Sequence, residues 1–460
     1  MRGNVFSTNW KNNQSLNAMS NSNVIFRVQP GGSLRGEARV PGDKSVSHRS
    51  IMLGSLAEGT TRVSGFLQAE DCLATMNAFR AMGVEIEGPV EGCVTIHGVG
   101  MHGLKAPTQE LYLGNSGTSM RLLSGLLSGQ AFDSVLTGDP SLSRRPMKRV
   151  TNPLREMGAE IETTAAGTSP LKIKGGAKLK GIHYDMPVAS AQVKSCLLLA
   201  GLYAEGETSV REPAPTRDHT ERMLTGFGYP VEREGDVIKV RPGGKLTACD
   251  VDVPSDISSA AFFMVGASIA EGADVTLKHV GINPTRTGVI DILKLMGADI
   301  EIIDPREAGG EPVADIRIKS SPLHGIDIPE ALVPLAIDEF PVLFVAAACA
   351  EGQTRLTGAE ELRVKESDRI QVMADGLQIL GIDAQPTPDG MIVQGGKLGS
   401  GKVDSHGDHR IAMAFSIAAL RASGTIEISD CANVNTSFPI FVELARGLGL
   451  DIVSIEGEIV

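Results

Sequence analysis

The sequence predicts an α/β protein with two similar domains, built from six copies of one helix–strand unit. Three observations lead to this fold class. Two short patterns recur along the chain, some helices have a single apolar face, and others are apolar almost all round. The copies lie about 70 residues apart, which is too long for a solenoid repeat and suits a repeated supersecondary unit.

The first recurring pattern is a small or acidic residue, then glycine, then a β-branched stretch, and it predicts the start of a strand. It occurs at residues 57–59, 128–129, 204–206, 270–272, 350–352 and 422–424. The second pattern is an apolar residue, glycine and alternating apolar positions, which predicts a helix end followed by another strand. Its copies end at Ile86, Ile161, Val231, Ile300, Ala384 and Ile452.

Two kinds of helix are expected between these patterns. Residues 146–157 and 370–380 are amphipathic, with apolar positions in one stripe. The helices before the first pattern, such as 196–203, 260–270 and 342–350, are apolar on nearly every side. A helix of that kind must be buried all round. We therefore expect three central helices in each domain, enclosed by their own strands and outer helices.

The copies divide into two groups of three near residue 250. We predict an N-terminal domain over residues 43–250 and a C-terminal domain made of residues 24–42 and 251–460. The active site is expected in the cleft between them, a favoured place for a ligand. Residues 1–23 are rich in Asn and Ser and lack the apolar segment of a secretory signal, so we expect a disordered polar extension there.

The composition argues against several classes of function. A formal net charge of −12, with one Trp and four Tyr, argues against a nucleic-acid binder. No apolar run reaches the ~18 residues of a membrane span. The six cysteines are scattered without a C-x-x-C pair, which predicts a reduced, cytoplasmic protein with no metal site and no cofactor. An anionic ligand needs a local basic cluster, because the overall field repels it.

Polar, reactive residues stand at the start of each apolar helix. These starts are K-S-V-S-H-R (44–49), G-N-S-G-T-S-M-R (114–121), A-S-A-Q-V-K-S (189–195), P-S-D-I-S-S (254–259), D-E-F-P (338–341) and G-D-H-R (407–410). A helix N-terminus offers free N–H groups and a partial positive charge. If the helices run parallel within each half, their starts converge on one anion-binding cleft. One such motif is a weak signal, whereas six together are a strong one.

Further motifs extend this series. They are R-R-P (144–146), T-R-D-H-T-E (216–221), L-R-V-K-E-S-D-R (362–369), H-G-D-H-R-I-A-M (406–413) and T-S-F-P (436–439). From residue 26 to the C-terminus the chain resembles the EPSP synthase family, and most closely its class II branch. The resemblance implies two domains of three βαβαββ repeats each, with buried parallel helices in an inside-out α/β barrel. It also implies a monomer.

The reaction implied by the resemblance is transfer of the enolpyruvyl group of phosphoenolpyruvate to the 5-hydroxyl of 3-phosphoshikimate, with release of phosphate. This step belongs to the shikimate pathway, which leads to chorismate and the aromatic amino acids. Both substrates are polyanions, so the chemistry needs dense, preorganised cations together with a proton donor and acceptor.

The resemblance assigns roles to individual residues. Asp338 is implied as the base for the 5-hydroxyl, Glu366 as the acid that protonates the methylene carbon, and Lys44 as a third catalytic residue. The residues implied for 3-phosphoshikimate are Lys44, Ser45, Arg49, Ser190, Ala191, Gln192, Arg217, Asp338 and Lys365. Those implied for phosphoenolpyruvate are Lys44, Gly117, Arg145, Gln192, Arg369, His409 and Arg410.

Several of these residues also have a more ordinary interpretation. Ser190 alone is better explained as a helix cap, and Asp338 as an acidic residue at a helix start. Lys365, Glu366 and Arg369 are spaced like a surface charge network on one side of a helix. Cations around Glu366 would keep it ionised, so it must be partly shielded if it donates a proton.

Two positions depart from the family pattern. Thr436 stands where some members have a lysine, so one contact to phosphoenolpyruvate is either missing or supplied elsewhere. Gly117 stands where class II relatives commonly have alanine, whose methyl group crowds glyphosate, an inhibitor longer than phosphoenolpyruvate. We therefore predict that glyphosate inhibits this chain more strongly than its class II motifs suggest.

Two other functions stay open. The enolpyruvyl transferase that acts on UDP-N-acetylglucosamine has the same architecture, but it expects Lys-Asn where this chain has Lys44 and Ser45. It also expects a loop cysteine, which residues 108–121 lack. The second alternative is a non-catalytic binder of anionic metabolites, which would gain nothing from carboxylates such as Asp338 and Glu366 among its cations.

Overall fold

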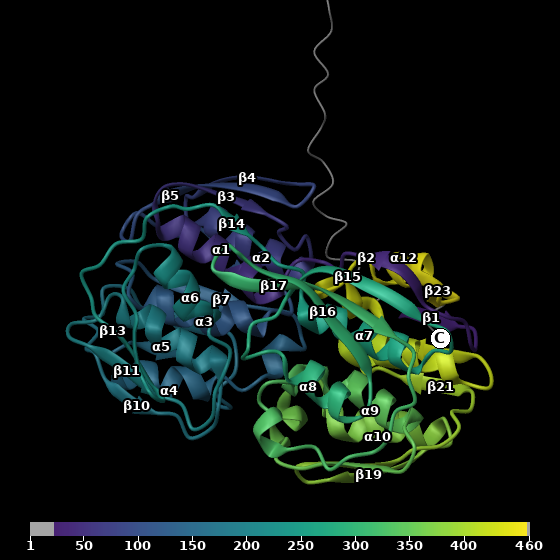
Figure 1. The fold of residues 1–460 in the computed structure, drawn as a ribbon. Coiled ribbons are helices and arrows are strands. Elements are labelled where there is room, and N and C mark those ends of the chain that lie inside the picture. The colour runs from purple at the N-terminus through teal and green to yellow at the C-terminus, as the bar shows by residue number, and fades with distance from the viewer. Residues whose placement is uncertain (1–22, 458–460) are drawn as a thin grey trace, which may run out of the picture.

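The computed structural model describes residues 23–457, which form two lobes side by side (Figure 1). Each lobe has its own hydrophobic core. The first core is formed by buried residues between positions 46 and 253, and the second combines residues 26–40 with residues 257–452. The predicted polar extension lies outside the described residues except for its last residue, Asn23, which begins strand β1 (Asn23–Val28).

The first lobe contains three copies of the predicted unit. The first copy comprises α1 (Lys44–Leu56), β3 (Glu58–Ser64), α2 (Glu70–Ala81), β4 (Glu85–Val90) and β5 (Cys93–Val99). The second comprises β6 (Leu111–Tyr112), α3 (Gly117–Ser128), β7 (Ser134–Thr137), the 3₁₀ turn η2 (Leu142–Arg144), α4 (Lys148–Glu156), β8 (Ile161–Glu162) and β9 (Leu171–Ile173). The third comprises β10 (His183–Asp185), α5 (Ala191–Gly201), β11 (Thr208–Arg211), α6 (His219–Gly226), β12 (Glu232–Glu234) and β13 (Val237–Val240), with β14 (Val251–Asp252) after it.

The second lobe repeats the plan. Its first copy comprises β2 (Arg35–Ala38), α7 (Ile257–Ile269), β15 (Asp274–Gly281), α8 (Gly288–Leu295), β16 (Asp299–Ala308) and β17 (Glu311–Lys319). Its second comprises η3 (Glu330–Leu332), η4 (Ile337–Glu339), α9 (Phe340–Cys349), β18 (Gln353–Leu356), η5 (Glu360–Val364), α10 (Arg369–Ile379), β19 (Asp383–Thr387) and β20 (Gly390–Gln394). Its third comprises β21 (Gly401–Asp404), α11 (His409–Ala418), η6 (Ala419–Arg421), β22 (Ile426–Ser429), η7 (Ala432–Thr436), α12 (Phe441–Leu448) and β23 (Ile452–Gly457).

The sheets of the described residues share one topology, which confirms the βαβαββ repeat. In β6-β7-β9-β8, for example, the first two strands are parallel, and β9 pairs antiparallel with both of its neighbours. The sheet β18-β20-β19 departs from the plan because isolated bridges at His324 and Asp327 replace its first strand.

Three sheets each contain one strand that comes from a distant part of the chain. Strand β1 lies between β22 and β23, and β2 pairs in parallel with β15, so residues 24–42 pair with the second lobe. Strand β14 pairs in parallel with β3 of the first lobe. The predicted limit at residue 250 therefore falls just before a strand that still belongs to the first lobe.

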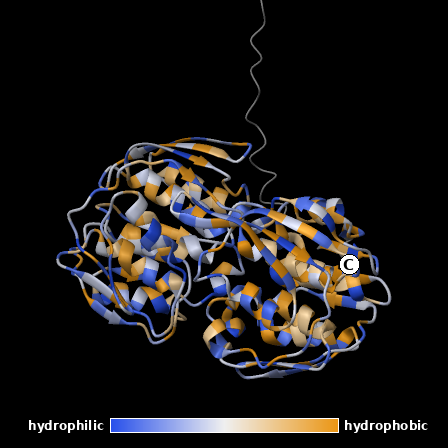
Figure 2. Cartoon of the chain, viewed as in Figure 1, coloured by the Kyte–Doolittle hydropathy of each residue, from blue (hydrophilic) through white to orange (hydrophobic). Residues whose placement is uncertain are grey.

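The central helices are buried as predicted. Every residue of α7 is buried, and Figure 2 shows the hydrophobic colour of the helices inside the second lobe. The outer helices end in glycines whose φ lies between 81° and 120°, a region that disfavours any residue with a Cβ. These glycines are Gly83, Gly158, Gly228, Gly297, Gly381 and Gly449. No helix in residues 23–457 has the length and apolar character to cross a membrane.

The contact between α3 and α5 gives a test of this packing. A Cβ on Gly125 would lie 2.1 Å from the carbonyl oxygen of Cys196, so the helices must separate to accept it. We expect Gly125→Ala to lower the free energy of unfolding by about 1–3 kcal/mol through overpacking. Gly447→Ala, on the exposed side of α12 with open space around it, should be neutral or stabilising by about 0.5–1 kcal/mol. Denaturant unfolding of both variants measures the difference, and equal effects would contradict the close approach.

Candidate active site

The cleft between the lobes contains a cavity of about 440 Å³, lined by residues of both. Each buried helix contributes its first turn or one of the two residues before it. These lining residues are Lys44 (α1), Gly117 (α3), Ala191 (α5), Asp256 (α7), Asp338 (before α9) and His409 (α11). The predicted convergence of the helix starts is confirmed, so their partial positive charges meet in one place.

Arg49 is the one predicted site residue that does not line the cavity. Its side chain is buried behind the start of α1, where Nε donates to Thr220 Oγ1 at 2.7 Å and Nη2 to Ser195 Oγ at 3.0 Å. Nη1 donates to the backbone oxygen of Ser45 at 3.0 Å. Burial lowers the pKa of Arg49 to about 10. In the structure Arg49 holds α1 against α5 and α6, and its contact with 3-phosphoshikimate stays a prediction.

Asp338, in turn η4 just before α9, forms ion pairs with cations from both lobes. Arg217 of the first lobe lies closest, with Nη2 2.6 Å from Asp338 Oδ2. Lys365 Nζ and Arg369 Nη1 lie 3.5 Å and 3.4 Å from Oδ1. Burial raises the pKa of Asp338, but these cations and Arg410 outweigh it and hold the pKa well below its usual range. The carboxylate is therefore ionised and faces cations rather than acting as a helix cap.

Lys365 and Glu366 lie outside the helix on which we predicted them. Turn η5 ends at residue 364 and α10 begins at Arg369, so the two residues occupy the bend between them. Arg369 is 1% exposed, which excludes a surface charge network at this position. The three residues do meet at one site. The bend between η5 and α10 brings them together, and their spacing along a helix does not.

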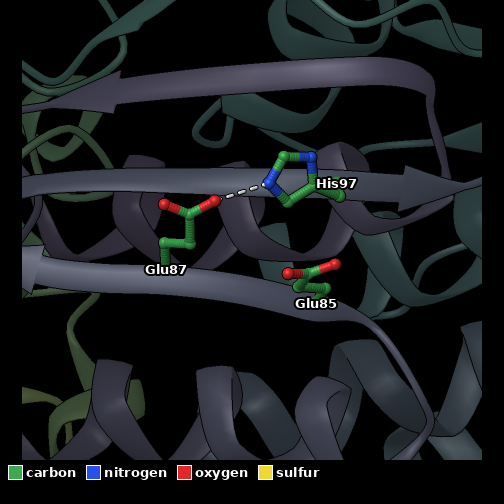
Figure 3. A group of neighbouring side chains, drawn as sticks. All are labelled: Glu85, Glu87 and His97. Atoms are coloured by element: carbon green, nitrogen blue, oxygen red, sulfur yellow. Dashed lines mark hydrogen bonds and ion pairs between the residues drawn. The ribbon is translucent and has the colours of Figure 1, made fainter.

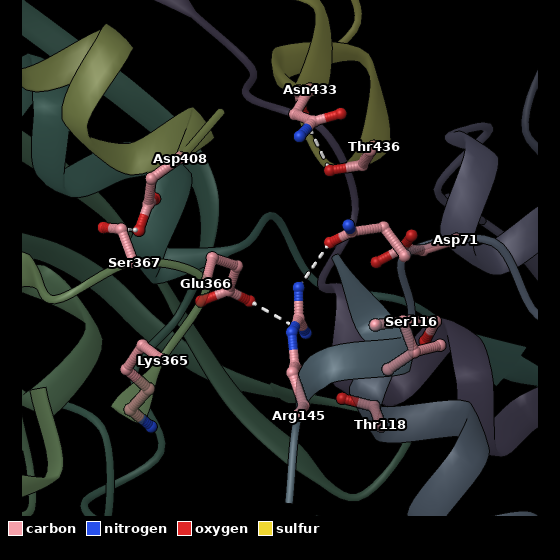
Figure 4. Close-up of polar contacts among 12 residues, drawn as sticks. Asp71, Ser116, Thr118, Arg145, Lys365, Glu366, Ser367, Asp408, Asn433 and Thr436 are labelled. Carbon is pink, nitrogen blue, oxygen red and sulfur yellow. Dashed lines mark hydrogen bonds and ion pairs between the residues drawn. The ribbon is translucent and has the colours of Figure 1, made fainter. Parts of the chain in front are cut away.

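Besides Asp338, Arg369 pairs with two further carboxylates of the second lobe. Its Nη2 lies 2.6 Å from Glu366 Oε2, and its Nε lies 2.8 Å from Asp408 Oδ2. On the other side of the cleft Arg145 reaches toward Glu366, with Nη1 3.5 Å from Oε1 (Figure 4). Burial raises the pKa of Glu366, but Arg369 and Arg145 bring it well below its usual range. The protein residues alone therefore do not supply the shielding that a proton donor needs.

The starts of α3 and α5 contact each other across the first lobe's side of the cavity. Ser190 caps α5 by accepting from the backbone N–H of Val193 at 3.3 Å, so the cap interpretation is confirmed, and it lines the cavity as well. Gln192 Nε2 donates to Thr118 Oγ1 at 3.0 Å, and its Oε1 accepts from Arg121 Nη1. Backbone and side-chain donors of two helices thereby face the same space.

The sequence analysis assigned no role to several polar residues of the cavity wall, among them Arg121, Asp71 and Arg149. Arg121 stands in a motif that was recognised, and its position in the first turn of α3 was the available signal. Asp71, in the first turn of α2, forms an ion pair with Lys44 Nζ, and burial raises the pKa of Asp71 despite that lysine. Arg149 of α4 reaches Glu361 of the other lobe at 2.8 Å. No motif marked the last two.

Thr436 lies behind the cavity wall rather than in it. It is 2% exposed, and its hydroxyl donates to the backbone oxygen of Asn433 at 2.7 Å. Asn433, which lies beside Thr436 in Figure 4, in turn donates through Nδ2 to the backbone oxygen of Gly407 at 2.7 Å, next to the start of α11. The threonine therefore closes turn η7 and supplies no cation, so any replacement for the family lysine comes from another element.

One group of possible metal donors occurs among residues 23–457, and it lies away from the cavity. Glu85 and Glu87 of β4 flank His97 of β5, with their donor atoms within 4.8 Å of one another (Figure 3). Glu87 Oε1 lies 2.7 Å from His97 Nε2. Both glutamates are exposed, and none of the three lines the cavity, so the group has no part in the cleft chemistry.

Comparison with known proteins agrees with this geometry. The family model of EPSP synthase (3-phosphoshikimate 1-carboxyvinyltransferase) matches residues 28–444. A 3-phosphoshikimate 1-carboxyvinyltransferase of Methylococcus capsulatus is 74% identical, over 94% of this chain and 99% of its own length. A 3-phosphoshikimate 1-carboxyvinyltransferase of Alkalilimnicola ehrlichii is 70% identical, over 92% of this chain and 96% of its own length.

A solved EPSP synthase structure from Acinetobacter baumannii superimposes with a TM-score of 0.85 at 66% identity, covering 94% of this chain and all of that one. Family model, relatives and structure agree over nearly the whole chain. The chain therefore belongs to the EPSP synthase (3-phosphoshikimate 1-carboxyvinyltransferase) family of enolpyruvyl transferases.

Proposed function

We propose that the cleft binds 3-phosphoshikimate at the start of α5 and at Arg217, and phosphoenolpyruvate between the two lobes. Phosphoenolpyruvate would bridge Arg145 of the first lobe and Arg369 and Arg410 of the second. Planar guanidinium groups match the oxygens of carboxylates and phosphates in pairs. Lys44, at the start of α1, would contact both substrates.

The transfer requires the methylene carbon of phosphoenolpyruvate to gain a proton and later to lose one, so that carbon carries the same number of protons at the end as at the start. Protonation of the methylene carbon of phosphoenolpyruvate makes its C2 electrophilic, and the 5-hydroxyl adds there as it loses its own proton. Loss of phosphate, and of one proton from the new methyl group, restores the carbon–carbon double bond. One base beside the hydroxyl and one acid beside the methylene carbon meet this need.

We assign the base to Asp338 and the acid to Glu366. The observation that carries the assignment is Arg369, whose Nη1 lies 3.4 Å from Asp338 and whose Nη2 lies 2.6 Å from Glu366. Both carboxylates therefore face one small volume. An anion between Arg145 and Arg369 would offset the charges that keep the pKa of Glu366 low, so binding of phosphoenolpyruvate would let Glu366 take up a proton.

The alternative of a non-catalytic anion binder is disfavoured by the same residues. In such a protein Asp338 and Glu366 would only compete with the ligand for its cations. The class II assignment, the monomer, the cytoplasmic location, the absence of nucleic-acid binding and the inhibition by glyphosate stay predictions.

Removing either carboxylate's charge tests the assignment. We expect Asp338→Asn and Glu366→Gln each to lower kcat by about 10²–10⁴-fold, because a positioned acid or base contributes that much. The measurement is phosphate release that requires both substrates. Asp327→Asn, whose side chain is 89% exposed, is the matched control and should keep full activity. If both variants keep kcat within a factor of two and only raise KM, the carboxylates bind substrate and do not transfer protons.

Gly117 sets the room beside the proposed phosphoenolpyruvate site. A Cβ there would lie 3.0 Å from Arg145 Nη1 and 3.1 Å from Arg121 Nη1, both at the ends of flexible side chains. Gly117→Ala should therefore fold, and we expect it to raise the inhibition constant of glyphosate about tenfold more than the KM for phosphoenolpyruvate, a difference of about 1.4 kcal/mol. Steady-state inhibition of both forms measures this. Equal changes, or an unmodified chain whose inhibition constant far exceeds its KM, would contradict the prediction.

His409 should stay uncharged at neutral pH. Burial lowers its pKa from 6.5 to about 3 and outweighs Asp408 and Glu366, which raise the pKa, while Arg410 and Lys44 lower it further. We expect its imidazole proton shifts to stay constant between pH 5 and 8, with the signal assigned by comparison with His409→Gln. Since the unfolded chain binds this proton near pH 6.5, the stability contribution of His409 should fall as the pH drops from there towards 3. A titration midpoint near 6.5 in the folded protein would refute this.

A further inference from the structure

The first helices of the two lobes begin side by side, where the chain crosses between them. The crossing segments pair with each other: Asp43 N donates to the backbone oxygen of Pro254 at 2.7 Å, and Asp256 N to that of Pro41 at 2.9 Å. Asp43 is the N-cap of α1 and accepts from Val46 N at 2.9 Å. Asp256 is the N-cap of α7 and accepts from Ser258 N at 2.9 Å.

Asp256 also holds the start of the other lobe's helix. Its second oxygen, Oδ2, accepts from the backbone N–H of Lys44 at 3.1 Å. The position of Lys44 is therefore set by a carboxylate of each lobe, since Asp43 caps its helix and Asp256 binds its own amide. Both carboxylates are nearly buried, and such neighbours repel each other unless a cation lies between them.

Arg286 is that cation. It lies between β15 and α8, is 3% exposed, and reaches both caps with the two prongs of its guanidinium. Nη1 contacts Asp43 Oδ2 at 2.5 Å, while Nη2 donates to Asp256 Oδ1 at 2.9 Å and to Ser258 Oγ at 2.6 Å. His219 Nε2 lies 3.4 Å from Nη1. A planar fork serves two carboxylates at once, which the single ammonium of a lysine does not.

We propose that Arg286 is a positioning residue that fixes Lys44 at the floor of the cleft by locking together the caps of α1 and α7. This proposal rests on the proposed function, in which Lys44 binds both substrates. Arg286 is among the residues that line the cavity, but both of its Nη atoms are paired with Asp43, Asp256 and Ser258, so it acts through these residues and not on the substrate. Its loss leaves the other cations of the cavity in place but frees the start of α1 to shift relative to the second lobe.

A double-mutant cycle tests this route. The dissociation constant of 3-phosphoshikimate is measured by calorimetry for the unmodified chain, Arg286→Lys, Lys44→Met and the combination. We expect Arg286→Lys to weaken binding about tenfold when Lys44 is present and less than about twofold when it is methionine, because residues that act through one another are not additive. Arg355→Lys, an exposed arginine of the same lobe, is the matched control and should leave binding unchanged.

The outcomes separate this proposal from the one on which it rests. Equal losses in both backgrounds would overturn it, because Arg286 would then act on the ligand directly or through the fold as a whole. Unchanged binding in Lys44→Met would overturn the role of Lys44 and the positioning role with it. If Arg286→Lys does not fold, Ser258→Ala replaces it, since it removes one Arg286 contact and keeps every charge. A smaller loss that again depends on Lys44 is then expected.

Kinetics give an independent readout. Because Lys44 would contact both substrates, displacing it in Arg286→Lys should raise two KM values together, the one for phosphoenolpyruvate and the one for 3-phosphoshikimate. A variant that only lowers stability should instead lower the amount of active enzyme and leave both KM values unchanged, and that result would overturn the proposal.

Discussion

Complete burial of the central helices is the constraint on which the rest of the structure depends. A helix that is apolar on every side, as α7 and α9 are, can present polar groups only at its ends. Because the helices of each lobe begin on the side of the cleft, their caps and first turns are the parts left for chemistry. The free N–H groups there favour anions before any charged side chain is counted.

Charge balance in the cleft then depends on a few buried carboxylates. The chain carries a net charge of −12, yet the cavity wall is rich in arginine and lysine. Arg369 is paired with Asp408, Glu366 and Asp338 at once, and Lys44 is paired with Asp71. These pairs hold the cations in place, and an incoming polyanion takes over part of the compensation. The carboxylates that neutralise the site, Asp338 and Glu366 among them, are also the ones whose pKa values the neighbouring cations hold low.

The recurring glycine patterns made the repeat and the cleft predictable from the sequence, because each marks a helix end or a strand start that needs a special backbone. The residues at the helix starts could be placed in the cleft because polar motifs precede the apolar helices, whereas their individual roles came from the family resemblance. What could not be predicted depends on tertiary contacts. No local sequence pattern predicts the burial of Arg49, the bend at Lys365 or the pairing of Asp71 with Lys44. The pairing partner of a two-residue strand such as β14 likewise cannot be predicted, because two residues are too few to show a hydrophobic periodicity.

The pairing of β1, β2 and β14 explains why the site lies where the chain crosses between lobes. Residues 43–253 supply all strands of the first lobe, including β14, whereas the second lobe needs β1 and β2 from before that stretch. The first lobe is therefore an insertion into the second, and the two ends of an insertion leave and return side by side. These ends, near residues 39–43 and 253–256, lead directly into α1 and α7. The caps of these helices lie where the two lobes are joined, so the proposed role of Lys44 would couple substrate binding to the geometry between the lobes.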